Sequence, residues 1–162
     1  MAKVKETIRE QRNALERLGS RIPGFRGYLD REARREADKV LRDHGALRLE
    51  RVVRELHEVA ANSALDQLND LHELINEVEK LRAELRYADR GYSGFFDEIK
   101  LDSSARLDAV YEKDERIVDQ IEQIAGQVSD VEFQTASVRA IVKRLGLALA
   151  DRRTAILGLG SR

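Results

Sequence analysis

Three histidines, His44, His57 and His72, are the side chains best suited to bind a metal ion or to transfer protons near neutral pH. A dimetal helical bundle needs paired Glu-x-x-His motifs that face inward. The residues three positions before these histidines are Leu41, Arg54 and Asn69, so the motif is absent. On one straight helix the three histidines would also point in different directions. The spacing favours solvated or interface histidines over a metal site.

Nucleophilic catalysis and phosphate binding also lack their usual patterns. The chain has no Gly-x-Ser-x-Gly motif, which would place a nucleophilic serine on a sharp turn. Gly158-Leu159-Gly160 stands at the chain end with no helix after it, so it is not a phosphate loop. Cysteine is absent, which excludes disulfides and thiolate metal sites. We therefore expect no catalytic residues, no metal and no cofactor, and we do not expect an enzyme.

Charged side chains are distributed unevenly along the 162 residues. Residues 1–60 hold 15 Lys or Arg and 11 Asp or Glu, residues 61–138 hold 8 and 18, and residues 139–162 hold 6 and 1. The chain is thus basic at both ends and acidic in the middle, although its net charge is −1. The first twenty residues are too charged for a secretory signal, and no apolar run approaches the ~20 residues of a membrane span. We expect a cytoplasmic protein.

Apolar residues recur with a helical period through most of the chain, which predicts an all-α fold. We expect a single helical domain over residues 1–162. A short helix over 3–18, with Val4, Ile8, Leu15 and Leu18 on one face, precedes a long helix over 28–87, an aromatic turn over 88–102 and a second long helix over 103–157. The sustained heptads favour a long antiparallel hairpin, or coiled-coil bundle. The short helix would pack back on it or reach a neighbour.

Two places could interrupt the first long helix. The heptad register shifts near Gly45, and Ser63, just after Asn62, could cap a new helix. We favour a continuous or gently bent helix, because neither place holds enough turn residues for a hairpin. Oppositely charged residues spaced i,i+4 are expected to support its exposed faces: Asp30–Arg34, Asp38–Arg42 and Glu50–Arg54. Apolar stripes wider than a two-helix seam indicate that further helices join, from the same chain or another subunit.

Half of the eight aromatic side chains lie in residues 86–104, namely Tyr87, Tyr92, Phe95 and Phe96. Gly91 and Gly94 break the helical period there, so this stretch is interpreted as the turn at the far end of the hairpin. The aromatic side chains could form a plug over the end of the bundle or an exposed docking site. We favour the plug, because two adjacent phenylalanines in water would promote association.

The segment 139–160 is basic and amphipathic, and its candidate interaction residues are Arg139, Lys143, Arg144, Arg152 and Arg153. Such a helix can lie on an anionic membrane. Its register also allows it to continue the coiled-coil seam, which we favour. In a hairpin, this segment would lie beside the start of the 28–87 helix. The basic ends would then meet at one pole, with the acidic middle at the other, and such a rod could associate pole to pole.

Two stretches are similar to a known family. They are Gly27-Tyr28 followed by Arg34-Arg35-Glu36-Ala37-Asp38-Lys39, and Arg90-Gly91-Tyr92-Ser93-Gly94-Phe95-Phe96-Asp97. Together they resemble a prokaryotic family of small helical proteins of unknown function, over roughly residues 25–120. The resemblance implies no activity, cofactor or catalytic residue. In layout, the chain also looks like the long-hairpin membrane-remodelling proteins of the phage-shock and ESCRT type.

These observations favour a non-enzymatic structural or interaction protein, an oligomeric helical scaffold or adaptor. Its partner would be itself or another helical protein. A second interpretation is a peripheral membrane protein that acts through its basic amphipathic ends on an anionic surface. A third is nucleic-acid binding, but the net charge near zero and the lack of a recognition motif argue against that partner.

Overall fold

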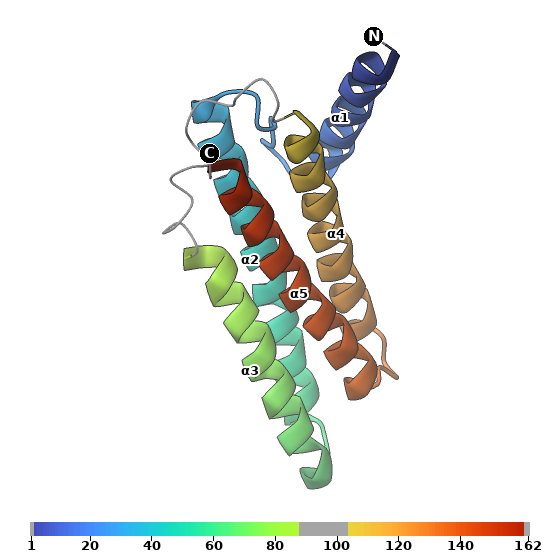
Figure 1. Ribbon diagram of the computed structural model, residues 1–162. Helices are drawn as coiled ribbons and strands as arrows, with labels where there is room; N and C mark the ends of the chain where they lie inside the picture. The colour runs from blue at the N-terminus through green and yellow to red at the C-terminus, as the bar shows by residue number, and fades with distance from the viewer. Residues whose placement is uncertain (1, 88–103, 161–162) are drawn as a thin grey trace.

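The computed structural model describes residues 2–87 and 104–160 (Figure 1). These residues form five helices: α1 (Ala2–Arg21), α2 (Arg31–Ala61), α3 (Leu65–Tyr87), α4 (Ser104–Val128) and α5 (Thr135–Gly160). No strand occurs in these two ranges. The prediction of an all-α helical bundle is therefore confirmed.

Four of the helices surround a common core. α2 packs antiparallel on α3, and α4 packs antiparallel on α5, while α2 also contacts α4 and α3 contacts α5. Arg48 pairs with Glu122, and Glu55 accepts a hydrogen bond from Ser129. Both pairs are 74 residues apart, so α2 and α4 run in the same direction. α1 packs on the outside of the bundle, against α4 (Figure 1).

The predicted continuous helix over 28–87 is wrong, because α2 ends at Ala61 and α3 begins at Leu65. The side-chain amide of Asn62 donates to the Glu58 carbonyl at 2.9 Å, and the Ser63 hydroxyl donates to the Val59 carbonyl at 2.6 Å. The first bond satisfies a carbonyl of the last turn of α2, and the second adds to the backbone hydrogen bond that the Val59 carbonyl accepts from Asn62. The chain thus reverses at the second of the two places that the sequence left open.

The predicted helix over 103–157 is also two helices, with a turn between Val128 and Thr135. Within this turn, the Asp130 carboxylate accepts a hydrogen bond from the backbone N–H of Glu132 at 3.1 Å. The heptad spacing concealed the turn, because Val131 continues the apolar pattern from Val128. In the structure Val128 is buried, whereas Val131 is 98% exposed.

Gly45 does not interrupt α2, which is helical on both sides of it. A Cβ atom built at Gly45 would lie 3.1 Å from Cδ1 of Ile121 and 3.1 Å from Cδ1 of Leu85. The glycine therefore allows α4 and α3 to bring large side chains close to the α2 backbone. The shift in heptad register marks this close approach.

The helices on either side of the aromatic stretch do not form one long hairpin. Because each predicted long helix folds back on itself, α3 ends and α4 begins at the end of the bundle where α2 starts and α5 finishes (Figure 1). We call this end the junction pole, and the other end, with the turns at 62–64 and 129–134, the turn pole. Tyr87 is exposed, whereas Tyr92, Phe95 and Phe96 lie outside the described residues.

Candidate functional site

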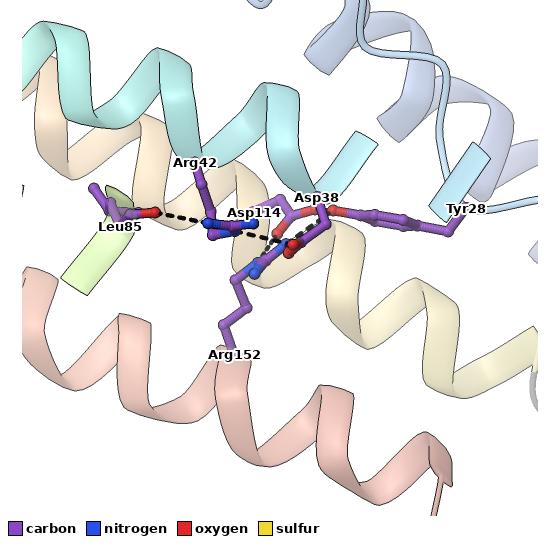
Figure 2. A network of polar contacts seen from close by, with 6 residues as sticks. All are labelled: Tyr28, Asp38, Arg42, Leu85, Asp114 and Arg152. Atoms are coloured by element: carbon purple, nitrogen blue, oxygen red, sulfur yellow. Dashed lines mark hydrogen bonds and ion pairs between the residues drawn. The ribbon is translucent and has the colours of Figure 1, made fainter. Parts of the chain in front are cut away.

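A network of buried polar side chains lies between the helices near the junction pole (Figure 2). Arg152 of α5 donates from Nε to Oδ1 of Asp114 on α4 at 2.6 Å. Its Nη2 donates to the Tyr28 hydroxyl at 3.2 Å and lies 2.9 Å from Oδ1 of Asp38 on α2. The Tyr28 hydroxyl in turn donates to Oδ2 of Asp114. Each of these four residues is at most 2% exposed.

Arg42 extends the network to the fourth helix of the bundle. Its Nε donates to Oδ2 of Asp38 at 2.9 Å, and its Nη1 donates to the backbone carbonyl of Leu85 on α3 at 3.0 Å (Figure 2). The sequence predicted the Asp38–Arg42 pair on an exposed face. The pair does form, but both side chains are buried, because the α2 face that carries them points between α3, α4 and α5.

The charges of the network balance each other. Burial raises the pKa of Asp114, while Arg152 and the Tyr28 hydroxyl oppose that rise. Burial alone would lower the pKa of Arg152, but Asp114, Tyr28 and Asp38 raise it well above its usual range. Burial and Asp114 raise the pKa of Tyr28 well above 10.0, so its phenol stays neutral. The arrangement holds helices in register, since each charge faces an opposite charge inside the bundle.

Two glycines with positive φ bring Tyr28 into the network. Gly24 and Gly27 have φ of 84° and 85° in the connection between α1 and α2. A Cβ atom at Gly27 would lie 2.6 Å from the Tyr111 hydroxyl, which accepts the Tyr28 backbone N–H at 2.9 Å. Here the missing side chain of glycine makes room for a structural hydrogen bond.

A groove of about 700 Å³ opens beside this network, between α2, α3 and α5. Its walls are mainly apolar, with Leu41, Leu85 and Leu149 among them. Arg42 and Arg152 stand on the wall, but both already bind carboxylates of the network. Three of the predicted interaction residues line the groove, namely Tyr87, Arg152 and Arg153.

The other basic residues of α5 do not form one face. Arg139 pairs with Glu73 at 3.3 Å and lies 3.6 Å from Glu77, both on α3. Lys143 and Arg144 are exposed on α5, whereas Arg152 is buried in the network. The apolar residues between them face the bundle core: Val138, Ile141, Val142 and Leu145. In this arrangement the apolar face of α5 is already covered.

A second hollow, of about 1090 Å³, lies at the turn pole between the two interhelical turns. We call it the acidic cleft, because five carboxylates line it: Glu55, Glu58, Asp66, Asp70 and Asp130. No Lys or Arg among the described residues lines it. Val131 and the half-buried Phe133 contribute apolar surface. The sequence indicated an acidic middle segment, but the cleft also depends on the two turns, and continuous helices were predicted at both places.

α1 is half packed and half exposed. Its second half contacts α4 through the buried Ala14 and Leu18, and through ion pairs of Arg17 with Glu115 and Arg21 with Asp119. We call residues 2–13 the α1 arm. Every side chain that the structure describes in the arm is exposed.

The apolar stripe of α1 runs through both halves. Leu18, at its inner end, is fully buried, whereas Val4 and Ile8 in the arm are 63% and 59% exposed. A helix that covers only part of its apolar stripe has an unpartnered face.

The three histidines differ in how far they are exposed to solvent. Burial lowers the pKa of the half-buried His44, whereas His57 and His72 are exposed. In the described ranges, no group of three or more His, Asp or Glu side chains is placed to hold a metal ion. None of the helices within these ranges has the length and apolar character needed to cross a membrane.

Comparisons of the chain with protein-family models, curated proteins and solved structures give no match, which is consistent with the resemblance to a family of unknown function.

Proposed function

We propose that this protein is a non-enzymatic helical scaffold or adaptor that assembles with copies of itself through the α1 arm. The observation that carries the proposal is the half-covered apolar stripe of α1. In the second half of α1 this apolar stripe is buried against α4, whereas in the arm it is exposed to solvent. A face of this kind is typical of a helix that completes its packing on a partner.

The energy available from this stripe indicates a reversible assembly. Full burial of Val4 and Ile8 would contribute roughly 1.5–3 kcal/mol for each side chain. Association costs at least about 4 kcal/mol in lost translational and rotational freedom. The two side chains together contribute roughly 3–6 kcal/mol, which leaves little net affinity after this cost. A stable contact therefore needs a partner surface that also offers charge or hydrogen bonds.

The polar network supports a structural role over a catalytic one. Its arginines and carboxylates are paired with one another and buried between helices. Catalysis needs an ionisable group that is free to act on a substrate, whereas the two guanidinium groups of the network that line the neighbouring groove are already paired with Asp38 and Asp114. The paired charges of this network support a structural role within the bundle.

Sedimentation velocity over a concentration series would test the assembly. We expect the wild-type chain to exceed its monomer mass of 18.5 kDa increasingly with concentration, and Val4→Ser/Ile8→Ser to stay monomeric. Leu47→Ser/Leu147→Ser is the matched control, since both residues are also exposed aliphatic side chains on helices, and it should assemble like the wild type. A double variant of the arm that still assembles normally would refute the role of α1.

Membrane binding is a second candidate function, because the arm combines exposed Val4 and Ile8 with basic residues. With the apolar face of α5 covered, α1 is the better membrane helix. Flotation with anionic vesicles would distinguish the two functions. Wild-type protein that floats, and an arm variant that does not, would favour the membrane; wild-type protein that stays at the bottom while sedimenting as an oligomer would favour the scaffold.

A further inference from the structure

We propose that the α1 arm of one copy docks in the acidic cleft of a second copy, so that copies join head to tail. This inference rests on the proposed function and names the surface that receives the arm. The arm lies at the junction-pole end of the molecule, whereas the turns whose residues line the cleft lie at the opposite end (Figure 1). Their chemistries are complementary in both charge and apolar character.

The basic side of the arm lies next to its apolar stripe. Lys5, Arg9 and Arg12 are spaced four and three residues apart, like the apolar residues beside them, so they share one side of the helix. The arm has four basic and two acidic residues, a net charge of +2. Its twelve residues make a helix about 18 Å long.

The cleft offers the matching surface. Five carboxylates surround it, and no Lys or Arg in the described part of the chain joins them in its lining. Val131 is 98% exposed on its wall, and Leu65, beside the cleft-lining Asp66, is 86% exposed. An arm seated here would bury Val4 and Ile8 against these apolar residues while its basic side meets the carboxylates.

Charge also decides between this arrangement and the simplest alternative. Pairing two arms across a twofold axis would bring two helices of net charge +2 together, and like charges oppose that contact. The cleft instead attracts the arm. Because arm and cleft lie at opposite poles, the contact is heterologous, and repetition gives either a closed ring or an open filament.

Mixing two variants tests the contact. Val4→Ser/Ile8→Ser lacks a working arm but keeps its cleft, and Glu58→Lys/Asp66→Lys lacks a working cleft but keeps its arm. We expect each variant alone to be monomeric by light scattering. An equimolar mixture should give a dimer of twice the chain mass and nothing larger, because the one functional arm meets the one functional cleft.

Two further variants make the test specific. Glu36→Lys/Asp151→Lys changes the net charge by the same amount on exposed residues away from the cleft, and it should assemble like the wild type. Lys5→Glu/Arg9→Glu should abolish assembly, and combining it with Glu58→Lys/Asp66→Lys in one chain should restore it. Circular dichroism melting of each variant confirms that it is folded.

The possible failures are distinguishable. If the arm variant is monomeric while the folded cleft variant still assembles like the wild type, the cleft is not the receptor, and the proposed function stands without this inference. If the wild-type chain is monomeric at every concentration, both fail. If the mixture of the two monomeric variants does not dimerise, head-to-tail docking is overturned.

Discussion

The two poles of the bundle use charge in opposite ways. At the junction pole, Arg42 and Arg152 meet Asp38 and Asp114 inside the protein, and every one of these side chains is buried. At the turn pole, five carboxylates gather around an open cleft that no Lys or Arg of the described chain lines. Like charges gathered on one surface repel one another and do not stabilise a fold.

This difference separates structural charges from charges available to a partner. The junction network connects α2, α3, α4 and α5, so its removal should affect folding. Among the cleft carboxylates, Glu55 and Asp130 accept hydrogen bonds within the fold, so removal of Glu58, Asp66 or Asp70 should be the change that affects binding. The following variants test this division, from the largest expected effect to the smallest.

Removing one member of the network should have the largest effect. Asp114→Ala leaves the Arg152 guanidinium buried without its closest carboxylate, and breaking such a pair typically costs about 3–5 kcal/mol. The free energy of unfolding from urea titrations measures the loss. A loss below about 1 kcal/mol would mean that water reaches the network and that the junction pole resembles the turn pole.

The control for Asp114→Ala replaces three members of the buried network at the same time. Tyr28→Phe/Asp114→Leu/Arg152→Met removes the phenol, the carboxylate and the guanidinium at once, and leaves Asp38 with Arg42. Replacement of a buried ion pair by apolar residues is often neutral or stabilising. The triple variant should therefore be more stable than Asp114→Ala alone.

A substitution of Gly27, in the connection between α1 and α2, should have an intermediate effect on stability. Gly27→Ala adds a Cβ that would lie 2.6 Å from the Tyr111 hydroxyl, in addition to the strain of positive φ, which costs on the order of 1–3 kcal/mol. Gly24→Ala is the matched control, because its φ is similar but no atom lies within 4 Å of the new Cβ. Thermal melting should place Gly27→Ala below Gly24→Ala; equal melting temperatures would refute the packing argument.

Changing the cleft should leave the stability of the monomer nearly unaltered. Glu58→Lys/Asp66→Lys alters two exposed side chains, and such surface changes usually stay within about 0.5 kcal/mol. Urea titration at a concentration where the chain is monomeric measures this. A large loss would show that the cleft carboxylates are structural after all, and would remove the contrast between the poles.

The smallest expected effect concerns His44, between the poles. Burial lowers its pKa in the folded state below 6.5, so the unfolded chain binds a proton more readily. This contribution to stability is present above pH 6.5 and is lost as the pH falls through the lowered value. Urea titrations at several pH values should show a shallower loss below pH 6.5 for His44→Gln than for the wild type. Parallel curves would contradict the role of His44.

The sequence predicted the helical class from periodicity but not where the long helices turn. Val131 kept the apolar spacing through the second turn, although it is exposed, because periodicity reports residue type and not burial. The side-chain hydrogen bonds at the first turn come from only two residues, Asn62 and Ser63, and so short a turn leaves a weak signal in the sequence.

The spacing of residues in the sequence contained an indication of the buried network. Asp114 stands at a core position of its heptad pattern, and Arg152 continues the apolar spacing of α5. A charged residue at a core position predicts an opposite charge nearby, but the sequence cannot say from which helix it comes. The contribution of Tyr28 to the network could not be predicted from periodicity, because Tyr28 lies in the irregular connection between α1 and α2.

The apolar stripe of α1 was visible in the sequence. The sequence did not show that one half of the stripe is buried and the other half exposed. Val4 and Leu18 belong to one repeat, and only the register against α4 leaves the first exposed and buries the second. The acidic cleft likewise combines residues from two turns far apart in the chain.

The most direct measurement is the molar mass of the wild-type chain by light scattering, over a concentration series at low and at high salt. Assembly of a basic arm in an acidic cleft predicts a mass that grows with concentration at low salt and approaches 18.5 kDa at high salt, where charge is screened. A mass of 18.5 kDa under all conditions, or an oligomer indifferent to salt, would contradict the account.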